Sequence, residues 1–290
     1  MVSRAGALRP LTMFGGCRVA GRRPAPSSHF GLQEAVHHQG IDRAQPRMVE
    51  RLGHPSDDRK AQRLPQLRRH RVAGKHEIEL HRAKAGGIVV LDVNTGEVLA
   101  MANLPSYNPN NRGKLDPRTT RNRTVTDLFE PGSTLKPFTV AAAIEAGTYK
   151  PETMIQTGNG QLVIGTATIH DAHPAGTLSV AQVIQKSSNV GAAKIALSLP
   201  AEKLWDIFSA VGFGTQPRSG FPGEGSGRLR GYANWRPIEQ ATMSYGHGIS
   251  VSLLQLARGY TIFATDGVLI PITMLRSDQD AVGPQVISLN

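Results

Sequence analysis

The sequence predicts a mixed α/β (α+β) domain over residues 77–290, and two observations carry that prediction. Two apolar runs separated by a turn signal, residues 88–93 and 97–102, are typical of a β-hairpin. Stretches of helical character, bounded by glycine and proline, then follow over most of the remaining chain. With 290 residues, 39% of them hydrophobic, the chain is long enough to form one large domain or two small ones.

The predicted hairpin comes first in this domain. Residues 88–93 read IVVLDV, an apolar run that predicts a buried strand. Residues 94–96 read NTG, which is a turn signal, and residues 97–102 read EVLAMA, which predicts the second strand. Residues 103–128 contain several prolines and asparagines, so we expect a long irregular connection after the hairpin.

Helices dominate the rest of the predicted domain. The first is expected at 133–146 with Gly147 as its stop, and the second at 178–186 with Thr177 as its N-cap. Two more are expected at 190–199 and 201–211, with Pro200 between them and Gly212 after them. The last is expected at Val251–Thr265, before Asp266-Gly267. Residues 212–231 are rich in glycine and proline and predict a loop. Val268-Leu269-Ile270 is expected to begin another strand.

The basic charge of the chain belongs to one segment. Residues 1–76 contain 15 Lys and Arg against 5 Asp and Glu, whereas residues 77–290 contain 18 against 17. The net charge of +11 therefore says nothing about partners of the predicted domain. Residues 1–76 lack a sustained apolar period, and we interpret them as a disordered or wrong-frame segment in preference to a nucleic-acid-binding arm around Arg68–Arg71.

Compartment signals are few. Cys17 is the only cysteine, so a disulfide framework within the chain and a cysteine metal site are both excluded. A single cysteine fits a cytosolic protein and equally an exported protein without disulfides. We find no run of 18 apolar residues that would span a membrane, and residues 1–19 do not follow the pattern of a signal peptide.

The strongest chemical signal lies in residues 129–139, which read FEPGSTLKPFT. Ser133 and Lys136 are three residues apart, so on a helix they share one face and can meet. A serine hydroxyl needs a base, and a lysine serves as one only when burial or a nearby cation lowers its pKa. About 0.6 Ser-x-x-Lys matches are expected by chance from this composition, so the motif must be read with its surroundings.

A second polar segment supplies those surroundings. Ser187 and Asn189 flank Ser188 between two predicted helical stretches, so both side chains can face one cleft. Ser187 can relay a proton between Lys136 and a leaving amine, and Asn189 can hold either a substrate amide or Lys136. The structural alternative is simple helix capping by serine and asparagine.

Other polar residues carry weaker signals. His170 and His173, with Asp171 between them, suggest a metal site, but they lack a third ligand, and we predict neither a metal nor a cofactor. His247 lies in YGHG, which is typical of a turn, and a structural role is favoured over catalysis. Trp205 and Trp235 are interpreted as core or loop anchors.

Residues 80–276 resemble the transpeptidase domain of class B penicillin-binding proteins, with the closest likeness to the cell-division type, penicillin-binding protein 3. The matching stretches are AGGIVVLDVNTGEVLAMANLPSYNPNNR, RNRTVTDLFEPGSTLKPFTVAAAIEAG, IQKSSNVGAAKIA, GFPGEGSGRL, NWRPIEQATMSYGHGISVSLLQLA and FATDG. They cover about 200 residues, and matches of this length are very specific. The resemblance implies the penicillin-binding and serine beta-lactamase-like fold, with a mixed sheet and helical lobes.

The same resemblance implies a function. Ser133 would be the nucleophile, Lys136 its base, and Ser187 with Asn189 the second-motif groups, while the group that takes the serine proton is left open. The substrate would be the D-Ala-D-Ala end of a peptidoglycan stem peptide, and beta-lactams would trap the same ester. The resemblance also implies divisome membrane proteins as partners and the periplasmic face of the bacterial inner membrane as location, and we expect no nucleic-acid partner.

The sequence departs from the family pattern at both ends. None of the nine lysines begins the family's third motif, Lys-Ser/Thr-Gly, and the membrane anchor and pedestal domain are missing. We therefore expect a C-terminally truncated domain with an exposed sheet edge that does not turn over as given. The alternatives are a non-catalytic remnant or partner-binding fragment and, more distantly, a serine beta-lactamase or beta-lactam sensor.

Overall fold

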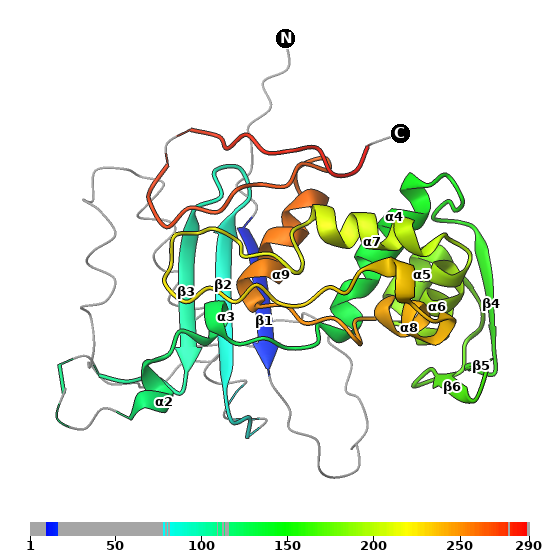
Figure 1. Cartoon of the computed structure of the whole chain (residues 1–290), viewed down its shortest axis with the longest axis horizontal. Helices are drawn as coiled ribbons and strands as arrows, with labels where there is room; N and C mark the ends of the chain where they lie inside the picture. The colour runs from blue at the N-terminus through cyan, green and yellow to red at the C-terminus, as the bar shows by residue number, and fades with distance from the viewer. Residues whose placement is uncertain are drawn as a thin grey trace, which may run out of the picture.

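A computed structural model describes residues 10–16, 78, 80, 82–108, 110–111, 113, 116–277 and 279–288. Figure 1 shows a sheet on one side of the molecule and a group of helices on the other, with α9 packed against the sheet. The predicted mixture of strands and helices is thus present. Within the described part of the chain, no helix combines the length and apolar character that crossing a membrane requires.

The main sheet is antiparallel and has the strand order β1-β2-β3. Its strands are β1 (Pro10–Gly16), β2 (Gly86–Asp92) and β3 (Val98–Leu104). The predicted hairpin is confirmed by β2 and β3, which pair from Gly86↔Leu104 to Leu91↔Val98. Asp92 shapes the turn, because its Oδ1 accepts hydrogen bonds from the N–H groups of Asn94 and Thr95 at 3.0 and 3.3 Å.

Strand β2 is the centre of this sheet and is almost wholly buried. Val89 and Leu91 pack with Leu253 and Leu254 of α9 and with Val125, which forms a small apolar core on one face of the sheet. Ile88 and Val90, whose side chains point to the opposite face, are buried as well, and burial of both faces explains the unbroken apolar run of β2.

Strand β1 lies inside the basic segment 1–76, where no apolar pattern predicts a strand. It pairs with β2 over seven residues, from Pro10↔Asp92 to Gly16↔Gly86. Consequently β2 has a partner on each side, and the outer edges of the described sheet belong to β1 and β3. Most of residues 1–76, including Cys17 and Arg68–Arg71, lie outside the described residues, so the division at residue 76 stays a prediction.

The helices gather around a second and larger core (Figure 1). The helical elements are α2 (Pro117–Thr120), α3 (Arg123–Thr126), η2 (Gly132–Leu135), α4 (Lys136–Glu145), α5 (Val180–Gln185), α6 (Asn189–Leu197), α7 (Ala201–Ala210), η3 (Tyr232–Asn234), α8 (Pro237–Met243), α9 (Leu253–Gly259) and η4 (Tyr260–Phe263). Phe138 of α4 is fully buried there, with its ring centroid 5.3 Å from that of Phe213 and 5.1 Å from that of Tyr260.

Two small antiparallel sheets between α4 and α5 were not predicted. Strand β4 (Met154–Gly158) pairs with β7 (Gly176–Ser179), and β5 (Gln161–Ile164) pairs with β6 (Ala167–His170). Their strands are four or five residues long, which leaves little room for an alternating pattern. Helix α8 was also missed, although Pro237 at its start is a recognised helix signal.

Several predicted helix boundaries shift. Thr177 was expected as an N-cap, but it lies in β7, and the cap of α5 is Ser179, whose hydroxyl accepts from the Gln182 N–H. The helix expected from Val251 starts at Leu253, because Ser252 caps it. The strand expected at 268–270 amounts to a single bridge between Val268 and Gln285.

Candidate active site

Ser133 lies on a 3-10 turn that leads into α4. The predicted helix start at Ser133 is close, but the first turn, Gly132–Leu135, is 3-10, and the α-helix begins at Lys136. Gly132 adopts a φ of 60°, a conformation that glycine reaches without strain. The turn is held by Thr134, whose hydroxyl donates to the carbonyl of Pro131 at 2.7 Å. Ser133 itself is exposed and therefore accessible to a substrate.

Lys136 lies directly beneath that serine and is only 1% exposed. Its Nζ is 3.0 Å from Ser133 Oγ, 2.9 Å from Ser187 Oγ and 2.6 Å from the Ser187 carbonyl oxygen. Burial lowers the pKa of Lys136 to about 8, although the negative charge of Asp171 works in the opposite direction. A lysine with that pKa is neutral in about a tenth of the molecules at pH 7, far more than an ordinary lysine, and this neutral form can accept a proton from Ser133.

The Ser187–Asn189 segment forms the turn between α5 and α6, as predicted. Ser187 has a φ of 55°, which is unusual for a residue with a side chain, and in this conformation both its carbonyl and its hydroxyl accept from Lys136. Ser188 caps α6, since its Oγ accepts from the Gly191 N–H at 2.8 Å. Capping and contact with Lys136 thus occur in the same segment, on different serines.

Asn189 faces a different neighbour from the other candidates. Its Nδ2 donates to the carbonyl oxygen of His170 at 3.0 Å, and the Nζ contacts of Lys136 go to Ser133 and Ser187. The structure therefore brings together Ser133, Lys136 and Ser187. It places the Asn189 amide nitrogen against the loop that follows β6.

Asp171 is a site residue that sequence reasoning missed. Its Oδ2 accepts from Ser188 Oγ at 2.7 Å and its Oδ1 accepts from the Val190 N–H at 2.9 Å. The HDAH sequence at 170–173 had been weighed as a metal site, so Asp171 was read with its histidine neighbours. No local signal marked it, because Asp171 lies in the loop between β6 and β7 and reaches the start of α6 only through the tertiary fold.

The segment 244–251 lies along the other side of the 3-10 turn Gly132–Leu135. Phe129 and Val251 exchange both backbone hydrogen bonds at 3.0 Å, and the Gly132 N–H donates to the Gly246 carbonyl at 3.2 Å. The predicted turn at 245–248 is confirmed by the hydrogen bond from the His247 N–H to the Thr242 carbonyl. Glu130 accepts from the Gly248 N–H at 2.8 Å and lies 3.2 Å from His247 Nδ1.

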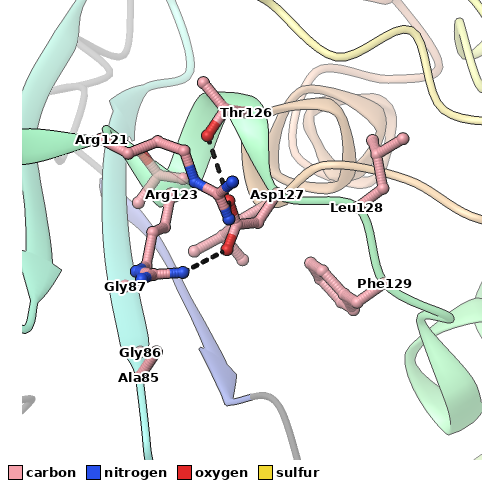
Figure 2. Close-up of a pocket in the computed structure, with 11 residues that line it drawn as sticks. Ala85, Gly86, Gly87, Arg121, Arg123, Thr126, Asp127, Leu128 and Phe129 are labelled. Atoms are coloured by element: carbon pink, nitrogen blue, oxygen red, sulfur yellow. Dashed lines mark hydrogen bonds and ion pairs between the residues drawn. The ribbon is translucent and has the colours of Figure 1, made fainter. Parts of the chain in front are cut away.

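A cavity of about 360 Å³ lies apart from these residues, between β2 and α3 (Figure 2). Gly87 and Phe129 line it, together with Arg121 and Arg123, which both pair with the Asp127 carboxylate at 2.6 and 2.8 Å. None of the four candidate residues lines this cavity.

Comparisons with known proteins identify the family of the chain. The family model "Penicillin binding protein transpeptidase domain" matches residues 86–289. A probable peptidoglycan D,D-transpeptidase PenA from Neisseria meningitidis is 48% identical over 208 residues, which cover 72% of this chain and 35% of the relative. Peptidoglycan D,D-transpeptidase FtsI from Escherichia coli is 41% identical over 209 residues, with the same two coverages. The chain thus spans about a third of the length of these curated relatives.

A solved structure supports the same assignment. The transpeptidase domain of Burkholderia pseudomallei penicillin-binding protein 3 matches with a TM-score of 0.67 and 49% identity, over 74% of this chain and 61% of that one. The predicted fold class is confirmed by this likeness and by the family match. On these grounds the chain belongs to the penicillin-binding protein transpeptidase domain family.

Proposed function

We propose that this chain carries the serine acyl-transfer centre of a peptidoglycan D,D-transpeptidase. One observation carries the proposal: the buried Lys136 Nζ lies 3.0 Å from the exposed Ser133 Oγ and 2.9 Å from Ser187 Oγ. A nucleophile, a base of lowered pKa and a second hydroxyl within hydrogen-bonding reach are the groups that acyl transfer requires. The relatives named D,D-transpeptidases point to the same reaction.

In the proposed first step, Ser133 Oγ attacks the carbonyl carbon of the penultimate D-Ala of a stem peptide. The serine proton passes to neutral Lys136, and the amine of the terminal D-Ala leaves after receiving a proton through Ser187. The product is an ester on Ser133. In the second step the amine of a neighbouring stem attacks that ester, which forms the cross-link and restores the Ser133 hydroxyl. A beta-lactam would form the same ester and remain attached.

The oxyanion that forms during attack by Ser133 needs hydrogen-bond donors. The Ser133 N–H would supply one donor, and the resemblance assigns the second to a Lys-Ser/Thr-Gly strand that the sequence does not contain. Loss of one such donor typically lowers the rate about 10²- to 10³-fold. The expectation that the chain as given does not turn over stays a prediction, and a non-catalytic fragment is the second candidate.

Fluorescent penicillin labelling tests the proposal. Labelling of the unchanged chain that disappears in Ser133→Ala and in Lys136→Met would support an acyl-transfer centre and would contradict the expectation of inactivity. Ser226→Ala is the matched control, because Ser226 is exposed and its hydroxyl contacts only the neighbouring Gly227 carbonyl. A folded chain that takes up no label at any concentration would favour the non-catalytic alternative.

Two further parts of the proposal come from the family alone. We place the protein at the periplasmic face of the bacterial inner membrane, in contact with division proteins, because relatives such as FtsI support a role in cell division. Fractionation of the producing cells, followed by detection of the chain in the membrane or periplasmic fraction, tests the location. Recovery in the cytoplasmic fraction would contradict it.

A further inference from the structure

The turn that presents Ser187 to Lys136 is held in an uncommon conformation. Ser187 has a φ of 55°, a region that residues with side chains rarely adopt because Cβ crowds the backbone. Such a conformation persists only where surrounding contacts fix it. Lys136 holds Ser187 itself by donating to its hydroxyl and its carbonyl, and the rest of the turn needs contacts of its own.

The contacts come from one carboxylate on another element. Asp171 accepts from the hydroxyl of Ser188 at 2.7 Å and from the N–H of Val190 at 2.9 Å. Both partners are buried, at 3% and 0% exposure, so the two bonds are shielded from water. The carboxylate also lies at the N-terminus of α6, where the helix dipole favours a negative charge.

Asp171 is in turn fixed by the small hairpin β5–β6. Its N–H donates to the Gly160 carbonyl at 2.9 Å, and it follows directly after His170, the last residue of β6. His170 forms a third hydrogen bond with the same turn, because its carbonyl oxygen accepts from Asn189 Nδ2 at 3.0 Å. The hairpin therefore holds the 187–189 turn by three hydrogen bonds from two adjacent residues.

We infer that Asp171 is a positioning residue for the proposed reaction: it fixes the Ser187–Asn189 turn so that the Ser187 hydroxyl and carbonyl face Lys136. The inference rests on the proposed function, since it assigns Asp171 a task within that site. Asp171 has no direct bond to the nucleophile and acts through Ser188 and Val190.

Electrostatics gives the inference a second and separate consequence. Titratable side chains on the segments around Lys136 include those of His170, Asp171, Lys186, Tyr245, Tyr260 and the pair of Glu130 with His247. Of these, Asp171 is the one whose charge acts on Lys136, and it raises the pKa that burial lowers. Removing the charge of Asp171 should therefore make Lys136 titrate at a lower pH, an effect that a purely structural residue would not have.

Three variants separate the two effects. Asp171→Asn keeps an oxygen for the Val190 N–H and removes the charge. Ser188→Ala keeps the charge and removes one of the hydrogen bonds. Asp171→Ala removes both, and a misplacement of about 1 Å at a reacting group can lower a rate as much as about 10²-fold. Lys203→Met is a surface control, because Lys203 is exposed on α7.

Nuclear magnetic resonance provides readouts that need no activity. With ¹³C at the lysine ε carbons, the Lys136 signal is identified by its absence in Lys136→Met, and its titration midpoint is followed in each variant. Backbone amide exchange reports the Val190 hydrogen bond. We expect Asp171→Ala to speed exchange at Val190 and to lower the Lys136 midpoint, Asp171→Asn to lower the midpoint alone, and Ser188→Ala to leave the midpoint in place.

The inference is overturned if either readout is unchanged in Asp171→Ala. If Asp171→Ala fails to fold, the Lys136 titration midpoint is compared between the unchanged chain and Asp171→Asn. Equal midpoints in these two proteins would overturn the inference. If the unchanged chain takes up fluorescent penicillin, Asp171→Ala should lower the labelling rate about tenfold or more. Absence of labelling in the unchanged chain would end the proposed function but would leave the titration comparison intact, so the two failures are distinguishable.

Discussion

Lys136 Nζ lies 2.9 Å from Ser187 Oγ, although 51 residues separate the two along the chain. The contact joins the first turn of α4 to the turn between α5 and α6, and it closes over a lysine that is almost fully buried. Burial of an ammonium group is unfavourable unless the group can lose its proton or find partners. This one relationship therefore sets both the chemistry and the stability of the site.

The pH dependence of acylation follows from the lowered pKa of Lys136. Because its pKa is about 8, the neutral form that can accept the Ser133 proton becomes dominant above that pH. We expect the rate of labelling by a fluorescent penicillin to rise through about pH 8 and then to level off. Rates measured from about pH 6 to about pH 10 check this, and a flat profile would contradict it.

Lys136→Arg is the matched variant for that profile. A guanidinium keeps the positive charge but does not lose its proton in a protein, so it cannot serve as the base. We expect labelling to be lost at every pH in this variant. Equal labelling of Lys136→Arg and the unchanged chain would show that Lys136 is not the base.

Lys136 should also lower the stability of the fold near neutral pH. Its pKa is about 8 in the folded chain against 10.5 for an ordinary lysine, so the unfolded chain binds the proton more tightly. The cost of burial is fully present below about pH 8 and disappears as the pH rises through 10.5. Lys136→Met should therefore stabilise the chain at pH 7 by up to about 3 kcal/mol, and by less at higher pH.

Urea unfolding of Lys136→Met at pH 7 and near pH 9.5 measures this effect. Lys203→Met serves as the control, because the exposed Lys203 should show no such pH-dependent gain. If Lys136→Met were less stable than the unchanged chain at pH 7, the hydrogen bonds from Nζ would outweigh the cost of burying the charge.

The sequence predicted those parts of the site that are local. Ser133 and Lys136 are three residues apart at the start of a helix, so their meeting follows from helix geometry. The hairpin of β2 and β3 was likewise readable from its apolar runs and the NTG turn. The mixture of strands and helices followed from local patterns, whereas the penicillin-binding fold followed from the family resemblance, because long specific stretches carry information that periodicity lacks.

The parts that could not be predicted depend on contacts between distant segments. Asp171 reaches Ser188 across 17 residues, and nothing in the local sequence marks a carboxylate as a partner for that turn. Gly246 touches Gly132 only because the chain returns there after α8. Threonine suits an N-cap, which is why the sequence predicts one at Thr177, but pairing of β7 with β4 extends the strand to Ser179.

Phe138 should be among the most important residues for stability. It is fully buried in α4, and its ring lies edge-on to Phe213 and Tyr260 at centroid distances of 5.3 and 5.1 Å. Phe138→Ala should cost about 3–5 kcal/mol of unfolding free energy, through lost burial and a cavity. Phe263→Ala is the control, since Phe263 is 42% exposed while its ring lies 5.1 Å from Phe138, and equal losses in urea unfolding would contradict the assignment.

Two glycines in the YGHG turn test how tightly the 3-10 turn Gly132–Leu135 is held. This turn carries the proposed nucleophile Ser133 and is called the nucleophile turn below. Gly246 and Gly248 have φ values of 87° and 85°, so an alanine at either position pays a similar backbone cost of about 1–2 kcal/mol. Only Gly246 lies against the nucleophile turn, because a Cβ there would lie 2.2 Å from the Gly132 carbonyl oxygen. A Cβ on Gly248 would meet nothing nearer than a Met243 methyl carbon at 4.0 Å.

The two alanine variants should therefore differ in activity, and Gly246→Ala should also be the less stable of the two because its Cβ meets backbone atoms of Gly132. Gly246→Ala must displace Gly132, the residue before Ser133, and a shift of about 1 Å there should lower the labelling rate by up to about 10²-fold. Gly248→Ala should lose stability in urea but keep most of its labelling, since its N–H still reaches Glu130. Equal labelling of the two variants would mean that the nucleophile turn yields to Gly246 without moving Ser133, and that the contact between Gly132 and Gly246 does not hold the serine in place.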